Sequence, residues 1–327
     1  MSDEINKHTR GALEQLQSLD LESKIMMTQA RIKAWYEHYD GNVYVSFSGG
    51  KDSTVLLHLV RDLYPDVEAV FCDTGLEFPE IREFVKTFTN VRWLRPRMNF
   101  KEVIQHYGYP MISKETSQYV YEARTTKSEK LLNIRLNGKK NGSGKIKEKW
   151  KFLINAPFQC SHMCCYIMKK NPSKKYEKET GNKPFIGTLA CESKLRKEAW
   201  LKHGCNAFEL SRPISAPLSF WTEQDVMRYI IENNLKIASV YGEIKKQNGV
   251  YTTTGEPRTG CMFCGFAYHK ENPNRFERIK ISHPKIYEFI MKPVNLGGLG
   301  MKEVLDYINM NLKKNIGYGE DDIRKFW

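Results

Sequence analysis

One stretch, VSFSGGKDSTVLLHLV at residues 45–60, combines two glycines, a lysine, an aspartate and several hydroxyl residues. Adjacent glycines after an apolar strand allow backbone N–H groups to face an anion, and a following helix N-terminus adds partial positive charge. Ser48 and Ser53 supply hydroxyl groups, and Lys51 supplies a mobile cation. The Walker A pattern fails because Asp52 follows Lys51, and the GxGxxG pattern is absent. The stretch therefore predicts a phosphate-binding loop of another class.

Two close cysteine pairs, Cys164 with Cys165 and Cys261 with Cys264, lie about a hundred residues apart among eight cysteines in all. Thiolates at such spacing can converge on one tetrahedral zinc ion or on one iron–sulfur cluster. Cys160 is a reserve ligand or a sulfur-handling thiol. The remaining thiols are predicted to be packed as small hydrophobic side chains: Cys72, Cys191 and Cys205.

The elements that must position these residues alternate in type. The pattern predicts helices and strands at 21–38 (helix), 43–47 (strand), 53–63 (helix), 67–72 (strand), 79–87 (helix) and 91–94 (strand). A later strand is expected at 185–189, and a helix is expected after Thr222, which fits an N-cap with Asp225 at the third helical position. This order predicts an α/β fold, a twisted parallel sheet with helices on both faces.

Composition and length set the broader class. The chain has 327 residues, of which 41% are apolar and 27% charged, without an apolar run long enough for a membrane span or an apolar leader. We therefore expect a cytoplasmic protein without membrane contact. The expected organisation is a helical lead-in at 1–40, a main domain at 41–270 and a helical region at 271–327.

Positive charge is concentrated in one segment. The net charge is +13, and residues 124–151 hold ten Lys or Arg against two Glu. Such a field attracts phosphate-rich partners, including DNA or RNA. The alternative is a solvated, mobile insertion with a turn at 137–144.

Several motifs together resemble a known family. S-G-G-K-D-S at residues 48–53 resembles the PP-loop of ATP pyrophosphatases, and D-T-G-L-E-F-P-E at 73–80 looks like the D-T-G-x-x-F-P-E segment of the phosphoadenosine phosphosulfate (PAPS) reductase family. Residues 187–196 are similar to its G-x-R-x-x-E-S-x-x-R, and residues 221–230 to its W-T-x-x-D-V-x-x-Y-I. The resemblance implies an adenine nucleotide α-hydrolase-like fold.

The resemblance also implies roles for single residues. It implies that ATP phosphates are bound by Ser46, Ser48, Gly49, Gly50, Lys51, Asp52 and Ser53, with Lys51 and Asp52 catalytic. It implies an adenosine site formed by Asp73, Thr74, Gly75 and Gly187, and an anion or acceptor site formed by Glu192 and Arg196. The Cys-Cys pair, followed by Lys169 and Pro172, is similar to the family's cluster motif, so the resemblance implies a [4Fe–4S] cluster on Cys164, Cys165, Cys261 and Cys264, with Zn²⁺ as the alternative.

Two departures bear on the reaction. Reductases of this family attack with a cysteine near the C-terminus, whereas no cysteine follows Cys264 here, and Leu189 replaces the arginine of G-x-R. Both count against sulfonucleotide reduction. We therefore expect an ATP α-pyrophosphatase that uses Mg²⁺, forms an adenylate and pyrophosphate, and activates a nucleic acid or small acceptor for sulfur transfer.

Two other functions stay open. One is a PAPS or APS reductase using Cys160 or Cys205, and the other is a non-catalytic nucleic-acid-binding module. Resemblance to DndC-type DNA phosphorothioation proteins and to CRISPR-associated relatives implies a sulfur donor such as a cysteine desulfurase, and a defence context.

Overall fold

The computed structural model describes residues 7–312, which divide into two compact units. Unit 1 comprises residues 7–73, 77–95 and 172–259, and unit 2 comprises residues 74–76, 96–171 and 260–312. The units interleave along the chain, and the three expected segments with boundaries at 40 and 270 stay a prediction.

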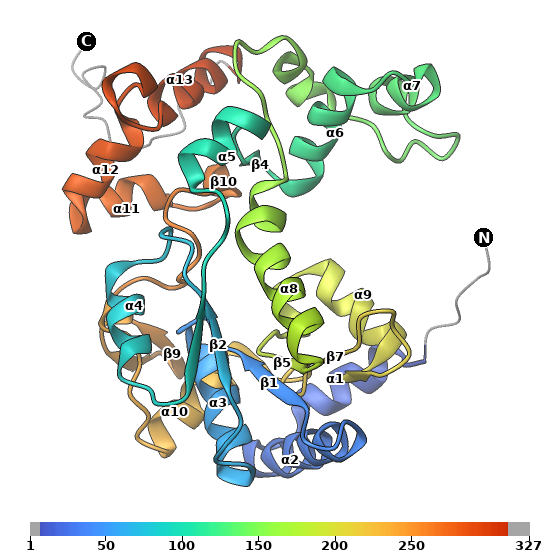
Figure 1. Cartoon of the computed structure of the whole chain (residues 1–327), viewed down its shortest axis with the longest axis vertical. Helices are drawn as coiled ribbons and strands as arrows, with labels where there is room; N and C mark the ends of the chain where they lie inside the picture. The colour runs from blue at the N-terminus through green and yellow to red at the C-terminus, as the bar shows by residue number, and fades with distance from the viewer. Residues whose placement is uncertain (1–6, 313–327) are drawn as a thin grey trace. The chain divides into compact units, whose positions relative to one another are not determined.

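Unit 1 is built on a six-stranded sheet with the order β3-β2-β1-β5-β7-β6 (Figure 1). Its strands are β1 (Val43–Ser46), β2 (Ala69–Cys72), β3 (Val91–Leu94), β5 (Lys183–Ile186), β6 (Asn206–Ala207) and β7 (Ile214–Ser215). Neighbouring strands are parallel except for the antiparallel pair β6–β7. The predicted parallel sheet is confirmed.

Helices cover both faces of this sheet. On one face, Tyr44 of β1 packs with Tyr176 of α8 (Asn171–Thr180). Val45, the next residue along β1, points to the other face and is in register with Phe185 of β5. The Phe185 ring lies 6.4 Å from the ring of Trp35 in α2 (Leu21–His38), so α2 packs on this second face.

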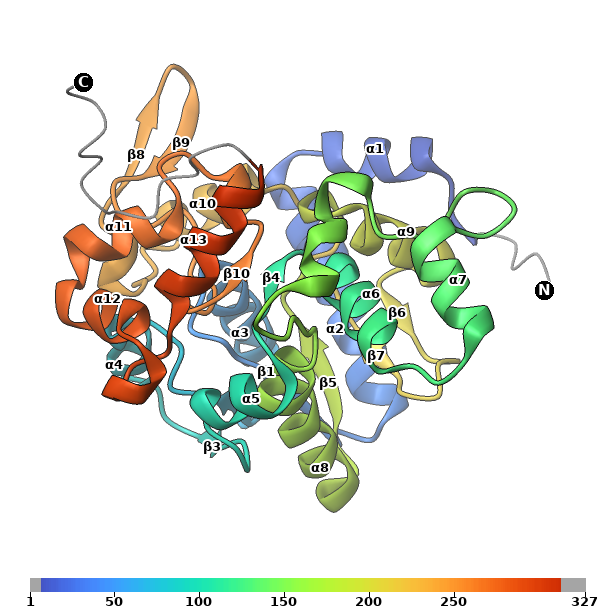
Figure 2. The same ribbon diagram turned by 90° about the horizontal axis from the view of Figure 1, so that it is seen from above.

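The other helices of unit 1 are α1 (Arg10–Ser18), α3 (Lys51–Leu63), α4 (Pro79–Lys86), α9 (Lys194–His203) and α10 (Glu223–Glu232). The helix expected from Ser53 begins two residues earlier, because Gly50 is its N-cap. The strand expected at 185–189 ends at Ile186. Thr222 and Asp225 form the expected cap of α10, as a reciprocal capping box. Figure 2 shows β8 (Ile244–Gln247) and β9 (Val250–Thr253) as a separate hairpin.

Unit 2 is largely helical. Its longer helices are α5 (Phe100–Tyr107), α6 (Lys114–Thr125), α7 (Glu129–Asn137), α11 (Arg275–Ser282), α12 (Pro284–Met291) and α13 (Met301–Leu312). Two short parallel strands, β4 (Met111–Ile112) and β10 (Gly265–Phe266), pair with each other. Helices α11 to α13 agree with the expected helical C-terminal pattern, whereas residues 313–327 lie outside the described residues.

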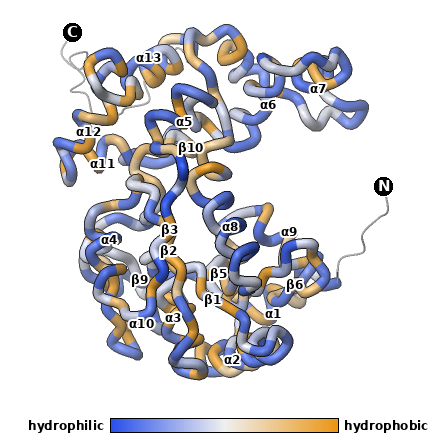
Figure 3. The backbone as a smooth tube through the Cα atoms, in the orientation of Figure 1, coloured by the Kyte–Doolittle hydropathy of each residue, from blue (hydrophilic) through white to orange (hydrophobic). Residues whose placement is uncertain are grey.

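Apolar and polar segments alternate along the backbone of both units (Figure 3). Within residues 7–312, no helix combines the length and apolarity that crossing a membrane requires.

Candidate functional site

The loop at residues 47–50 follows the carboxyl end of β1. Strand β1 lies between β2, which follows it in the chain, and β5, which comes much later. This is where the strand order reverses, and open α/β sheets bind ligands at such a point. Ser46 pairs with Ile186, so Gly187 at the end of β5 lies beside the loop.

Two glycines allow the loop to approach its neighbours. Gly49 has a φ of +70°, and a Cβ there would lie 2.8 Å from Ile81 Cγ2. A Cβ on Gly187 would lie 3.0 Å from the backbone nitrogen of Ser53. Both positions therefore require glycine if the helix N-terminus is to keep its place.

Some loop amides are already satisfied by hydroxyl groups. Ser48 N donates to Ser53 Oγ over 3.2 Å, and Gly50 N donates to Ser48 Oγ over 3.3 Å. Lys51 N donates to the Tyr241 hydroxyl over 3.3 Å. These contacts shape the loop from within unit 1.

Other amides remain available to a ligand. Within residues 7–312, no group accepts a hydrogen bond from the amides of Gly49, Asp52 or Ser53. Amides in the first turn of a helix have no intrahelical acceptor. Three donors therefore lie at the positive end of α3, where phosphate oxygens bind well.

Lys51 is buried and held by three groups. Its Nζ lies 3.2 Å from Glu223 Oε1 and 3.2 Å from the carbonyl oxygen of Pro257, and 5.1 Å from the centre of the Tyr241 ring. A buried cation needs such partners, because removal from water is costly. A phosphate that reaches Lys51 competes with the Glu223 carboxylate for this charge.

Asp52 is the second charged group of the loop. Burial raises the pKa of its carboxyl group, Lys51 opposes this shift, and Glu223 adds to it by charge repulsion. Asp52 and Glu223 are thus a carboxylate pair within electrostatic range of each other, and Glu223 also contacts Lys51, the residue before Asp52.

A group of ionic side chains lies next to this pair. The Glu192 carboxylate forms ion pairs with Arg196 and with Arg258, the latter over 3.1 Å. Burial lowers the pKa of Arg196, and the charge of Arg258 lowers it further. Both guanidinium groups act electrostatically on Asp52, which places them near the loop. Leu189, at the position of the expected arginine, is buried.

The predicted adenosine segment is divided between the units. Asp73 belongs to unit 1, where Arg82 Nη2 lies 2.9 Å from its carboxylate. Thr74 and Gly75 belong to unit 2. The next residue, Leu76, accepts a hydrogen bond from Met262 N over 2.8 Å, which links this segment to the second cysteine pair.

The four paired cysteines lie near one another in unit 2. The Cys164 thiol donates to Cys165 Sγ over 3.9 Å, which raises the pKa of Cys164 and lowers that of Cys165. Nearby Lys114 and Lys169 also favour the Cys165 thiolate. Cys164 is further affected by the charges of the second pair, so the two pairs lie within electrostatic range of each other.

The second pair has its own supporting contacts. Burial and the neighbouring Cys261 raise the pKa of Cys264 to about 11, and Arg275 opposes the shift. Phe266 N donates to Cys264 Sγ over 3.5 Å, and Arg275 donates to the Cys264 carbonyl oxygen over 3.0 Å. In residues 7–312, no three His, Cys, Asp or Glu side chains are grouped as they would be around a single metal ion.

Comparison with protein families identifies the chain's relatives. The profile of the phosphoadenosine phosphosulfate reductase domain matches residues 42–132 and 109–265. The chain belongs to this PAPS reductase family. The resemblance seen in the phosphate loop is thereby confirmed at family level.

The individual relatives of this PAPS reductase family protein are distant from it in sequence. MJ0973 and MJ0066 of Methanocaldococcus jannaschii, both named as uncharacterized proteins, are each 27% identical over 90% and 79% of the chain, and the chain spans 54% and 42% of their lengths. An adenosine 5'-phosphosulfate reductase of Staphylococcus epidermidis is 25% identical, over 80% of this chain and 86% of that protein. The PAPS reductase structure from Candida auris aligns with a TM-score of 0.38 at 16% identity, covering 72% of this chain and 95% of that one.

Among three single thiols, Cys205 is buried as expected, whereas the environments of Cys160 and Cys191 differ from the expectations. Cys160 is fully buried, and burial raises its pKa to about 12, which disfavours a sulfur-handling role. Cys205 is also buried. Cys191, expected to be packed, is an exposed residue, although its thiol donates to the Trp221 carbonyl oxygen over 3.7 Å. Its pKa is raised, first by partial burial of the sulfur and also by the charges of Asp52 and Glu223, so Cys191 lies within electrostatic range of Asp52, next to the loop at residues 47–50.

Other residues of this site were missed by the motifs. Tyr241 and Thr259, whose hydroxyl oxygens lie 2.5 Å apart, and Arg258 all come from the segment after α10. Glu223 follows the N-cap of α10, and only its helix was predicted. No spacing in the sequence relates these residues to the loop.

Proposed function

We propose that the chain is an ATP α-pyrophosphatase of the PAPS reductase family that adenylates an acceptor. The observation that carries the proposal is a loop with three available amides, next to which Glu223 lies 3.2 Å from Lys51 and within electrostatic range of Asp52. Carboxylates by themselves repel any anionic nucleotide, but they bind the Mg²⁺ that accompanies ATP. Mg²⁺ is usually held by one or two carboxylates together with substrate phosphates.

The proposed reaction follows from this placement. The amides of Gly49, Asp52 and Ser53 bind the β and γ phosphates, and Lys51 neutralises their charge. An acceptor oxygen attacks the α-phosphorus, the bond from that phosphorus to the bridging oxygen breaks, and pyrophosphate leaves. The protein contributes positioning and charge stabilisation.

Arg196 and Arg258 suit the acceptor side of this site. One carboxylate, that of Glu192, is shared by the two guanidinium groups, so it neutralises only one of their two positive charges. Both arginine side chains are partly exposed and can reach an anion. We assign them to an anionic group of the acceptor or to the α-phosphate.

We further propose that Cys164, Cys165, Cys261 and Cys264 bind a [4Fe–4S] cluster. Four thiolates are the usual ligands of such a cluster. In such a cluster each of the four thiolates would bind a different iron, so the four sulfurs would not have to surround one point as they would around Zn²⁺. The N–H···S contact from Phe266 supports a thiolate at Cys264. When bound, the cluster would supply sulfur or electron-transfer chemistry.

Product analysis with α-labelled ATP and Mg²⁺ tests the adenylation proposal. AMP or an adenylate, together with pyrophosphate, is expected. ADP with inorganic phosphate would overturn it. Anaerobic purification followed by iron and zinc analysis tests the metal separately, and stoichiometric zinc without iron would overturn the cluster.

Sulfonucleotide reduction is the second candidate, favoured by the relatives named adenosine 5'-phosphosulfate reductases. The attacking thiol would then be Cys191, which is exposed near the loop. Sulfite release from adenosine phosphosulfate with thioredoxin, abolished by Cys191→Ser but retained in Cys160→Ser, would favour reduction over adenylation.

A further inference from the structure

The basic segment 124–151 is a folded projection. Arg135 of α7 holds it together: its guanidinium donates to the Glu122 carboxylate of α6 over 2.5 Å and to the Gly144 carbonyl oxygen over 2.8 Å. The same guanidinium lies 4.1 Å from the centre of the Tyr119 ring. Ile146 is buried and closes the loop against the helices. These contacts show that the segment is folded, so its charged side chains extend from α7 and the loop packed against it.

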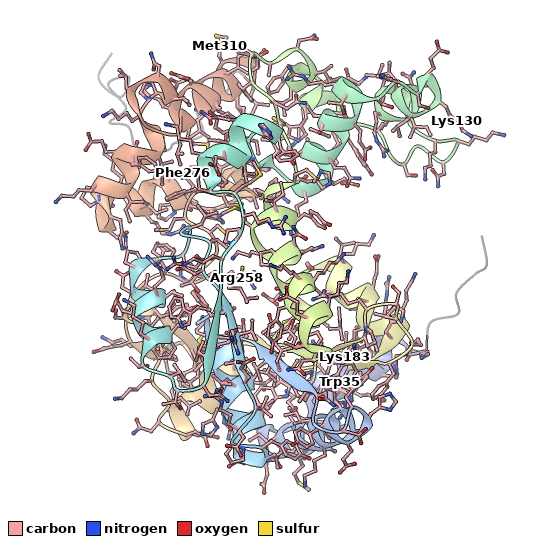
Figure 4. All side chains as sticks on the ribbon, viewed as in Figure 1. Trp35, Lys130, Lys183, Arg258, Phe276 and Met310 are labelled. Atoms are coloured by element: carbon pink, nitrogen blue, oxygen red, sulfur yellow. The ribbon has the colours of Figure 1, made fainter. Side chains whose placement is uncertain are left out.

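Most of the ten basic side chains are uncompensated. Only Arg135 and Lys151 of these ten form ion pairs with carboxylates in the described part of the chain. The others are exposed, namely Arg124, Lys127, Lys130, Lys139, Lys140, Lys145, Lys147 and Lys149. Figure 4 shows the Lys130 side chain extending away from α7. The projection therefore presents a positive surface without internal neutralisation.

The chemistry of this surface limits its partners. Among residues 7–312, no large hydrophobic side chain that is exposed falls within 124–151. A protein partner would need apolar or aromatic anchors, and a membrane surface would need an apolar helix face. Base stacking would need exposed aromatic rings. What remains is attraction to closely spaced phosphates.

We propose that residues 124–151 bind the phosphate backbone of a nucleic acid without reading its sequence. The proposal deepens the proposed function by naming the class of acceptor-bearing partner, but binding itself does not require ATP cleavage. Each neutralised phosphate contributes about −0.9 to the slope of log K against log salt concentration on duplex DNA. Contacts from about five of the eight exposed cations would give a slope of about −4 to −5.

The test uses the full chain and a fluorescent DNA duplex, with ATP omitted. Anisotropy titrations are made across roughly 50 to 200 mM salt. The variant carries Lys139→Gln, Lys140→Gln and Lys145→Gln, whose side chains are exposed, so folding should be preserved. We expect the slope to become shallower by about 2 to 3 and binding to weaken at least roughly tenfold.

A matched control removes the same charge elsewhere, through Lys33→Gln, Lys236→Gln and Lys285→Gln, which are also exposed. The control should bind like the wild type. Equal weakening in both triple variants, or no DNA binding at low salt, would overturn the proposal. Binding to anionic phosphatidylserine vesicles but not to DNA would overturn it in favour of a lipid surface. DNA binding is measured without ATP, so a protein that binds DNA but forms no products in the separate ATP assay would contradict the proposed function alone.

Discussion

Replacing Gly187 with alanine perturbs the start of α3, which follows the loop at residues 47–50. The new Cβ would lie 3.0 Å from both the nitrogen and the Cα of Ser53, and 3.1 Å from the carbonyl carbon of Asp52. All three are backbone atoms, which cannot rotate away as a flexible side chain can. The end of β5 or the start of α3 must therefore shift by a few tenths of an ångström.

Two magnitudes follow from this geometry. Overpacking of this kind costs about 1–3 kcal/mol of folding stability. The methyl group also covers the Ser53 amide, and a hydrogen bond to a charged group is worth about 1.5–3 kcal/mol. At about 1.4 kcal/mol per tenfold change, Gly187→Ala should weaken nucleotide binding by roughly 10- to 150-fold.

Calorimetric titration with a non-hydrolysable ATP analogue and Mg²⁺ measures this loss, with thermal unfolding measured in parallel. Gly11→Ala in α1 is the control, because its nearest atom would be 4.0 Å away and alanine favours a helix by about 0.5–1 kcal/mol. If folded Gly187→Ala binds the analogue as tightly as the wild type, the Ser53 amide is not a phosphate ligand and the loop assignment is wrong.

Three further changes probe the site. Lys51→Met should lower kcat/KM for ATP about 100- to 1000-fold, because it removes one preorganised cation from the charged leaving group; unchanged turnover in steady-state assays would contradict its role. Asp52→Asn should raise the unfolding temperature at neutral pH, because burial raises the pKa of Asp52 and the folded state disfavours its charged form. That gain should vanish as the pH falls below about 4, where the carboxyl group is neutral in both states, and a gain that is independent of pH would refute the explanation. Cys261→Ser should abolish the cluster absorbance at about 400 nm in anaerobically purified protein, whereas Cys191→Ser should retain this absorbance. Full absorbance in the Cys261→Ser variant would show that Cys261 is not a cluster ligand.

The nucleotide-binding half of the fold was predictable because its signals are local. An apolar strand, paired glycines and a helix lie next to one another in the chain, and Thr222 caps its helix with a residue three positions away. The start of α3 was placed two residues late, since Gly50 caps it with backbone geometry and without a side-chain hydrogen bond.

The residues of the candidate site that the sequence did not predict are those brought to the loop by tertiary contacts. Lys51 contacts Glu223, which is 172 residues away in the sequence, and the carbonyl oxygen of Pro257, which is 206 residues away. Hydrophobic periodicity and local motifs do not predict contacts between residues so far apart in the chain. Arg258 meets Glu192 for the same reason. The sequence also did not predict that segment 124–151 is folded. Its fold depends on Arg135, which donates hydrogen bonds to both the Glu122 carboxylate and the Gly144 carbonyl oxygen.

The position of bond formation tests the central claim most directly. ATP, Mg²⁺ and the protein are incubated in 18O-labelled water, with water serving as acceptor, and the products are resolved by mass spectrometry. Attack at the α-phosphorus predicts 18O in AMP and none in pyrophosphate. Label in inorganic phosphate, with ADP as the other product, would contradict the assignment of the loop at residues 47–50 as the site of α-phosphorus attack.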